Sequence, residues 1–250
     1  MNICAPMPRR GAQSKAQHGP LHLATFVHGR GFVTYKDLGA GDPATTRRLV
    51  AETVAYFHAD PEISRVEWKA RGHDHAPGLH EALLENGFAR DEQESIMIGE
   101  AQALSVDVAL PDGVTLRQVI DETDVRAMSA MQDEVFEEPV SNEMADALLL
   151  RLSLHDGMEL WVAEAEGRIV SAGRLEPVQG TGFAGIWGGA TREEWRGRGI
   201  YRALTARRAR SALDMGKTLI HSDSTGFSRP ILERSGFTKV STTTPYRWQR

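Results

Sequence analysis

Apolar residues recur at helical spacing along two neighbouring stretches of the chain, 121–138 and 143–154. Val125, Met128 and Met131 lie three positions apart in the first stretch, so a helix would place them on one side. Residues 114–119 precede both stretches, follow a Pro-Asp-Gly turn and carry the residue types of a strand. The pattern therefore predicts a strand followed by two amphipathic helices.

Three further strands are predicted over 160–165, 169–175 and 182–190. The connections between them, Glu166-Gly167 and a Gln-Gly-Thr-Gly segment, are of the hairpin type, so the three strands should be antiparallel. A helix over about 200–215, a strand over 218–223, a short helix and terminal strands follow. This order predicts an α/β (α+β) fold with a mixed, mostly antiparallel central sheet flanked by helices.

The chain also carries a sign of internal repetition. Four residues recur in the same type 149 positions later: Asp74, Leu83, Gly87 and Phe88 correspond to Asp223, Leu232, Gly236 and Phe237. Each block follows an alternating segment and runs through a short helical stretch to Gly-Phe. We interpret this as two related halves, although two unrelated strand-helix-strand units would give a similar pattern.

The Pro-Asp-Gly turn at 111–113 marks the start of the second half. We therefore expect a disordered tail over 1–20, a first domain over 21–104 and a second over 105–250. The tail has no apolar stretch that could form the core of a secretory signal.

Composition excludes several classes of protein. Hydrophobic residues make up 41% and charged residues 25% of the 250 residues, as in an average globular protein. No apolar run exceeds four residues, which is far too short to span a membrane. The net charge of −5 disfavours binding of the whole chain to nucleic acid, and Cys4, the only cysteine, cannot form an intrachain disulfide or a cysteine-based metal cluster. We expect a cytoplasmic protein without a nucleic-acid or membrane partner, either a monomer or a homodimer.

The segment Trp195-Arg196-Gly197-Arg198-Gly199-Ile200-Tyr201 lies between a predicted strand and a predicted helix. Glycines let the backbone approach a ligand closely, and the first turn of a helix offers unpaired N–H groups to an anion. Seven arginines and two glutamates between positions 192 and 210 add local positive charge. The segment thus predicts a phosphate site. A solvated basic helix face, with Arg202, Arg207, Arg208 and Arg210 projecting from it, an Arg-Gly contact to nucleic acid and a plain turn remain as alternatives.

This segment resembles the R/Q-x-x-G-x-G/A loop of the GNAT superfamily of acyl-CoA-dependent N-acetyltransferases. Residues 231–237, Ile-Leu-Glu-Arg-Ser-Gly-Phe, are similar to the last helix of that family and its Gly-Phe exit, and the likeness covers 114–250. With the repeat, the resemblance implies a tandem protein whose first half is a degenerate GNAT-like unit. The corresponding loop of that half, 38–47, contains Asp42 and no Arg-Gly-x-Gly, and an acid there would repel a pyrophosphate.

The resemblance implies acetyl-CoA as co-substrate, no metal, and direct attack of a primary amine of a small molecule or peptide on the thioester. It implies that the loop amides hold the pyrophosphate and that the preceding strand lies beside the pantetheine arm. Water or a nearby hydroxyl such as that of Ser228 could protonate the thiolate. The residues implied in donor binding are Gly189, Ala190, Thr191, Arg196, Gly197, Arg198, Gly199, Ile200, Tyr201 and Ser228.

A base must accept the proton of the attacking amine. Asp223 and Glu176 are the candidates, because both are expected at strand ends, which often border clefts; a helix cap is the alternative role for Asp223. The chain departs from the family at Tyr201, where Gly or Ala is usual, and at Leu232, where many members carry the tyrosine that protonates the thiolate. A non-catalytic acyl-CoA-binding regulatory module is therefore an alternative function.

Overall fold

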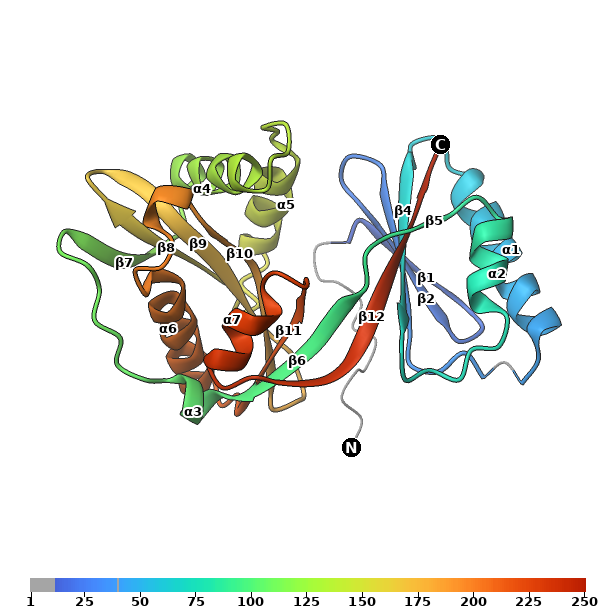
Figure 1. Cartoon of the computed structure of the whole chain (residues 1–250). Helices are drawn as coiled ribbons and strands as arrows, with labels where there is room; N and C mark the ends of the chain where they lie inside the picture. Colours follow the sequence, from blue (N-terminus) through green and yellow to red (C-terminus); the bar gives the residue numbers. More distant parts are fainter. Residues whose placement is uncertain (1–11, 40) are drawn as a thin grey trace. The chain divides into compact units, whose positions relative to one another are not determined.

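The computed structural model describes residues 12–39 and 41–250, and the chain packs as two compact units (Figure 1). Unit 1 comprises the chain up to Ser95 together with Ser241–Arg250, and unit 2 comprises Ile96–Val240. This division differs from the expected boundary at 104/105. The C-terminal residues belong to unit 1 because they pair with a strand of that unit, a long-range contact that no local sequence pattern encodes.

Unit 1 is a sheet in the order β1-β2-β3-β4-β12, with two helices and the short strand β5, which pairs with β12. Its elements are β1 (Ser14–His18), β2 (Leu21–Phe26), β3 (Arg30–Tyr35), α1 (Pro43–His58), β4 (Arg65–Arg71), α2 (Leu79–Glu85), β5 (Ala89–Arg90) and the greater part of β12 (Thr238–Gln249). Its core contains Val50, Phe57, Trp68 and Leu83.

Strand β1 lies in the segment that we expected to be a disordered tail. It pairs with β2 in antiparallel register, Ser14 opposite Thr25 and His18 opposite Leu21. The expectation is therefore wrong for these residues, because neighbouring backbone groups give them hydrogen-bond partners. Residues 1–11 lie outside the described residues.

Unit 2 contains one mixed sheet in the order β6-β11-β10-β9-β8-β7. Its elements are β6 (Glu94–Glu100), α3 (Ala101–Leu104), β7 (Val114–Val119), α4 (Glu122–Val135), α5 (Glu143–Leu152), β8 (Glu159–Ala165), β9 (Arg168–Pro177), β10 (Phe183–Thr191), η1 (Glu193–Trp195), α6 (Ile200–Asp214), β11 (Leu219–Ser224) and α7 (Arg229–Arg234). The predicted mixed α/β fold, with a mostly antiparallel sheet flanked by helices, is confirmed. Glu166 and Gly167 have φ values of 52° and 71° and form the predicted β8–β9 hairpin turn.

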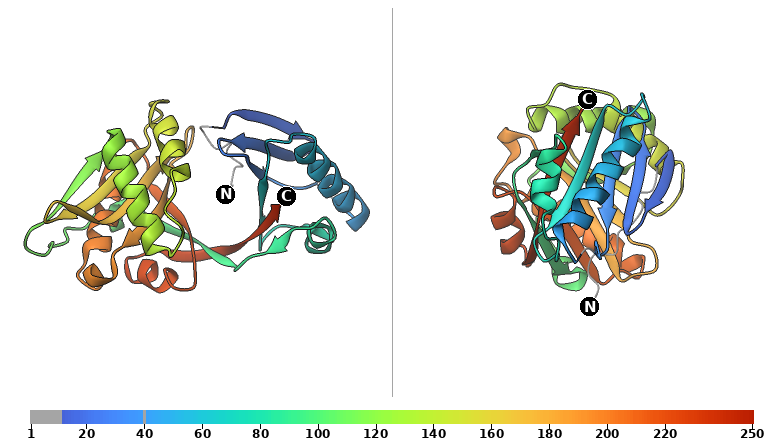
Figure 2. Two further views of the ribbon diagram at one scale, coloured as in Figure 1. Left: turned by 90° about the horizontal axis from the view of Figure 1, so that it is seen from above. Right: turned by 90° about the vertical axis from the view of Figure 1, so that its right-hand side faces the viewer.

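Helices cover both faces of this sheet (Figure 2). Leu160 and Val162 of β8 pack in the cluster of α4 and α5, whereas Trp161 and Ala163 pack in the cluster of α6. Alternate residues of a strand point to opposite faces, so one strand supplies both cores. Among the described residues, no helix combines the length and apolar composition needed to span a membrane.

Candidate active site

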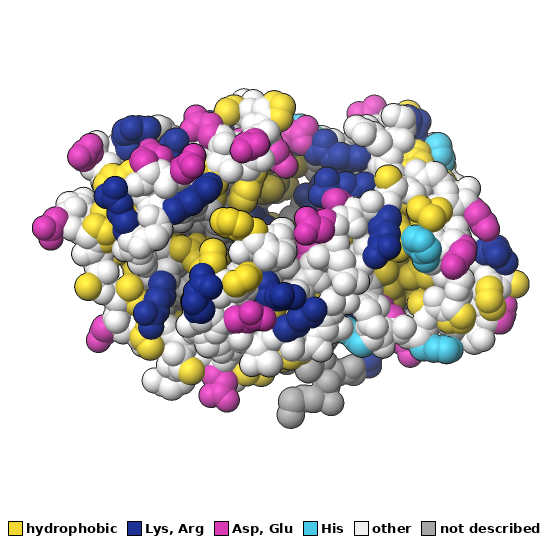
Figure 3. Space-filling view, in the orientation of Figure 1, with side chains coloured by type: hydrophobic (Ala, Val, Ile, Leu, Met, Phe, Trp, Pro, Cys, Tyr) yellow, Lys and Arg dark blue, Asp and Glu magenta, His cyan; other side chains and the backbone are white. Residues whose placement is uncertain are grey.

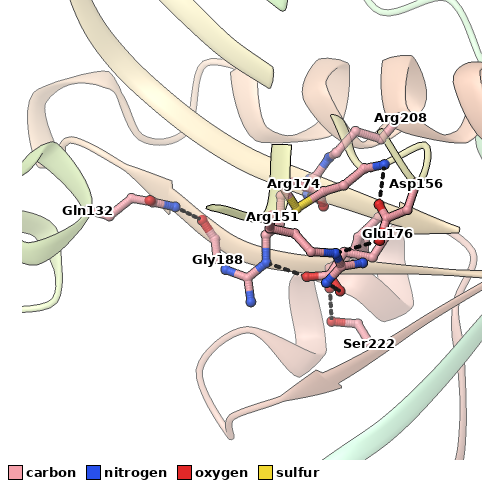
Figure 4. A network of polar contacts seen from close by, with 10 residues as sticks. Gln132, Arg151, Asp156, Arg174, Glu176, Gly188, Arg208 and Ser222 are labelled. Carbon is pink, nitrogen blue, oxygen red and sulfur yellow. Dashed lines mark hydrogen bonds and ion pairs between the residues drawn. The ribbon is translucent and has the colours of Figure 1, made fainter. Parts of the chain in front are cut away.

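Strand β10 contains a bulge in its middle. Its pairing with β9 shifts between Trp187 and Ala190, and Gly188 has a φ of 60°. The Gln132 side-chain amide of α4 donates to the Gly188 carbonyl (Figure 4). Because of the extra residue, side chains before and after the bulge point to opposite faces of the sheet. Ile186 packs in the α6 cluster, and Ala190 packs in the α4 and α5 cluster.

Strands β10 and β11 separate just before this bulge. They pair in parallel over three positions, from Phe183 opposite Leu219 to Gly185 opposite His221, although both strands continue further. Beyond that point the Ser222 hydroxyl donates to the Ile186 carbonyl at 3.1 Å. The separation opens the sheet between two of its central strands.

A cavity of about 1100 Å³ lies at this opening, within unit 2. It is lined by the β10 bulge, the loop before α6, the first turn of α6, β11 and α7. Among the described residues, four arginines line it (Arg196, Arg202, Arg208 and Arg234), and Asp223 is the only acidic one. On the face of unit 2 that Figure 3 shows, Lys and Arg side chains lie among apolar ones. The cavity therefore favours a ligand with an anionic portion.

The first turn of α6 faces this cavity with its backbone. Gly199 is the N-cap with a φ of 81°, Gly197 has a φ of 73°, and both line the cavity. Among the described residues, no side chain caps this helix. Its first N–H groups and the positive end of its dipole can therefore bind an anion.

The corresponding helix of unit 1 is capped differently. The carboxylate of Asp42 accepts hydrogen bonds from the amides of Ala44 and Thr45 at 2.9 Å each. These bonds hold the pKa of Asp42 below its usual range. An anionic side chain thus occupies the N-terminus of α1 and takes two of its first amides as hydrogen-bond donors.

The family model that matches the chain is described as the acetyltransferase (GNAT) family, and it covers residues 125–237. These residues form a GNAT domain. The match spans α4, the bulged β10, the loop before α6 and the end of α7, which are the elements around the cavity. The chain is accordingly an acyltransferase.

Solved structures share the fold of the chain at low sequence identity. A GCN5-related N-acetyltransferase from Kribbella flavida has a TM-score of 0.70 at 18% identity, covering 94% of this chain and 89% of that one. A tandem GNAT protein from the clavulanic acid biosynthesis pathway has a TM-score of 0.67 at 13% identity, with 92% and 78% covered. A GCN5-related N-acetyltransferase from Sphaerobacter thermophilus has a TM-score of 0.62 at 18% identity, with 92% and 76% covered. None of the curated proteins matches the chain.

The structure brings most of the predicted donor-binding residues of the GNAT domain into one cavity. Those that line it are Gly189, Ala190, Thr191, Arg196, Gly197, Gly199, Ile200, Tyr201 and Ser228. Arg198 does not line it; its guanidinium lies 4.8 Å from the centre of the Trp195 ring. The loop therefore contributes mainly backbone groups, together with Arg196.

The arginines between residues 192 and 210 do not form a single basic face. Arg192 pairs with Glu134 at 2.8 Å, Arg210 pairs with Asp107 at 2.8 Å, and Arg207 lies over the Trp161 ring. Arg208 is 0% exposed, so its predicted position on the polar face of the helix is wrong. It is buried because it lies against β9, where it donates to the Arg174 carbonyl at 3.3 Å.

The two candidate bases lie in different surroundings. Asp223 belongs to β11 and lines the cavity. It does not cap α7, whose N-cap is Ser228. Glu176 does not line the cavity, because Arg174 and Arg151 bind its two carboxylate oxygens at 2.7 and 3.2 Å (Figure 4). The geometry thus favours Asp223 over Glu176.

His221 lies two residues before Asp223 on the same strand, with its ring 5.3 Å from that of Trp187. Burial lowers the pKa of His221, and the carboxylates of Asp223 and Glu176 oppose this shift. The lowered pKa favours the neutral imidazole at pH 7. Among the described residues, no group of three or more His, Cys, Asp or Glu is placed to hold a metal.

Sequence reasoning missed several residues around the cavity. These are Phe136, Gly188, Ser222, Arg208, Phe227 and Arg234. Phe136 and Phe227 are 50% and 74% exposed, which is unusual for large aromatic side chains. Gly188 offered a signal, because adjacent glycines inside a predicted strand often mark a bulge.

Proposed function

We propose that the chain transfers an acetyl group from acetyl-CoA to a primary amine of a small molecule or a peptide. The observation that carries the proposal is the single cavity in which the uncapped N-terminus of α6 meets the bulge of β10. The N-terminus of α6 suits the diphosphate of the donor, and the bulge of β10 suits its thioester. Both groups of the donor would thus bind within unit 2.

The donor fits the residues that are present. The amides of Gly197, Gly199 and Ile200 would hold the pyrophosphate, with charge from Arg196 and Arg202. At the bulge, backbone amides of Gly189 and Ala190 would bind the thioester oxygen and stabilise the negative charge that develops on it. One such donor typically contributes about 10² to 10³ in rate.

Asp223 is the base in this proposal. A lysine-type amine is protonated at pH 7, since its pKa is about 10.4, and must lose a proton to attack. Asp223 lies at the cavity on β11, opposite the bulged strand, so that the attacking amine lies between the base and the thioester. Holding both reactants in line supplies the rest of the catalysis.

We further infer that unit 1 is a GNAT-like unit without a donor site. Two observations support this inference: the Asp42 carboxylate caps α1, and a solved structure of similar fold is a tandem GNAT protein. Unit 1 would then contribute structure rather than chemistry.

The test measures release of coenzyme A from acetyl-CoA over a panel of amines and peptides, with Asp223→Asn as the inactive comparison. We expect turnover that depends on the amine, and a rise in Tm when coenzyme A binds. A rise in Tm with no turnover for any amine would favour the regulatory module instead. If neither turnover nor a thermal shift is seen, the donor assignment is wrong.

A further inference from the structure

The departing thiolate of coenzyme A needs a proton, and the position that resembles the family's tyrosine cannot supply one. Leu232 occupies that position and is 1% exposed in the core beside α6. Its side chain is a hydrocarbon. The proton must therefore come from water or from another group of the cavity, provided that the proposed acyl transfer takes place there.

Five aliphatic hydroxyls line the cavity, and each already has a protein partner. Ser222 donates to the Ile186 carbonyl, and Ser235 donates to the Ile231 carbonyl at 2.9 Å. Thr191 contacts the Ser171 hydroxyl at 2.8 Å, and Thr225 contacts the Ser228 hydroxyl at 3.2 Å. Aliphatic hydroxyls are also much weaker acids than a phenol. Ser228, which sequence reasoning suggested as the proton source, is a poor acid on both counts.

Tyr201 is the only phenol among the described residues that line the cavity. It lies directly on the β10 bulge. A Cβ atom added to Gly189 would be 2.6 Å from Cε2 of the Tyr201 ring and 3.1 Å from its hydroxyl oxygen. The phenol oxygen is thus placed at the backbone segment that the proposed function assigns to the thioester.

A buried cation accompanies this phenol. The Arg208 guanidinium lies 5.9 Å from the centre of the Tyr201 ring, is 0% exposed and has no carboxylate partner among the described residues. Its hydrogen bonds go to the carbonyls of Leu204 and Arg174 and to the Thr205 hydroxyl. A positive charge in such surroundings stabilises negative charge that develops on a neighbouring oxygen.

We propose that the Tyr201 hydroxyl is the general acid of the reaction, in place of the missing tyrosine at position 232. The amine nitrogen forms a bond to the thioester carbon, and the carbon–sulfur bond breaks with its electron pair remaining on sulfur. The Tyr201 hydroxyl gives its proton to that sulfur. The proton of the amine goes to Asp223 and from there to solvent, and solvent returns one proton to the Tyr201 phenolate, so that both residues regain their starting states.

Arg208 is a positioning residue in this scheme, because it acts on the phenolate and not on the substrate. The position of the Tyr201 ring explains the glycine at 189, since only a residue without a side chain leaves room for that ring. The chain thus departs from the family pattern at two positions, and the phenol gained at 201 takes the place of the phenol absent at 232.

The first test is Tyr201→Phe, which keeps the ring on Gly189 and removes only the hydroxyl. We expect kcat with acetyl-CoA to fall about 10²-fold, at the low end of what a general acid contributes, because a thiolate is already a fair leaving group. The KM for acetyl-CoA and the Tm should change little. Tyr56→Phe, a phenol in unit 1, is the matched control and should keep wild-type kcat.

The second test changes the leaving group. The selenium analogue of acetyl-CoA releases a selenolate, which is a weaker base than a thiolate and needs no proton to leave. Tyr201→Phe should therefore act on this analogue at nearly the wild-type rate, and Arg208→Met should show the same selective defect in smaller degree. A loss of packing would slow both donors equally.

The third test restores the phenol at the other position. Leu232→Tyr in the Tyr201→Phe background should recover part of the lost kcat with acetyl-CoA. The proposal is overturned if Tyr201→Phe keeps wild-type kcat, or if it loses activity equally with both donors. An inactive wild-type chain would instead contradict the proposed function, so the two failures are distinguishable.

Discussion

Gly173 of β9 lies directly against the buried guanidinium of Arg208. A Cβ atom at position 173 would be 2.4 Å from Nη1 of Arg208 and 2.8 Å from its Cζ. The guanidinium also donates to the carbonyl of the next residue, Arg174, which stands opposite Trp187 at the edge of the β10 bulge. Gly173 of β9, Arg208 of α6 and the β10 bulge are thus packed together at the cavity.

Gly173→Ala should destabilise unit 2 by about 1–3 kcal/mol, because the added methyl group meets a side chain that has no room to move. Urea denaturation would measure the loss. The control is the same substitution in an Arg208→Ala background, where the methyl group has space and the cost should nearly vanish. Equal costs in the two backgrounds would contradict the packing described.

Arg202→Ala should weaken binding of coenzyme A more than Arg198→Ala does. Arg202 is exposed and lines the cavity, whereas Arg198 lies over the Trp195 ring outside it. Removing a charge-assisted contact to a phosphate costs about 1.5–3 kcal/mol, or roughly 10- to 150-fold in Kd. Calorimetric titration of the three proteins would measure it.

The loss on Arg202→Ala should shrink at high salt, because ions screen an exposed charge. If the two variants bind coenzyme A equally well, the phosphates do not lie where the cavity suggests.

Local patterns in the sequence predicted most of unit 2. The helical spacing before residue 154 and the Glu166-Gly167 turn depend only on neighbouring residues, and the strands and helices formed within a few positions of their predicted bounds. The glycine loop was likewise found from its own residues. These features are local, so a single sequence carries them.

Long-range contacts could not be predicted in the same way. The C-terminal strand joins unit 1 because Tyr246 stands opposite Trp68, residues far apart in the chain. The burial of Arg208 depends on a glycine in another strand, and the engagement of Glu176 depends on arginines from α5 and β9. These contacts can be recognised only in the folded structure, because arginine and glutamate suit a solvated surface equally well.

Glu176→Gln should mainly lower stability, whereas Asp223→Asn should mainly lower kcat. Glu176 binds Arg151 and Arg174, so its loss should lower the free energy of unfolding by about 1–3 kcal/mol. Activity per folded molecule should be largely retained. Asp223→Asn should instead lower kcat by about 10² to 10⁴ with a smaller change in stability.

Steady-state kinetics and denaturation of both variants would separate these roles. A large fall in kcat for Glu176→Gln, with Asp223→Asn fully active, would exchange the two assignments.

The partly buried imidazole of His221 should make folding stability depend on pH. Burial lowers the pKa of His221, so between that value and the ordinary value of about 6.5 the unfolded chain holds a proton that the folded chain lacks. Stability is therefore complete above about pH 6.5 and falls as the pH drops below it, by at most about 1.4 kcal/mol per pH unit. His221→Asn should remove this contribution, so that the difference in unfolding free energy between wild type and variant narrows from pH 7.5 to pH 5.5. The exposed His155 supplies the control, since His155→Asn should leave the slope of the wild type unchanged. Parallel pH profiles for wild type and His221→Asn would show that the His221 ring takes up its proton equally well in the folded chain.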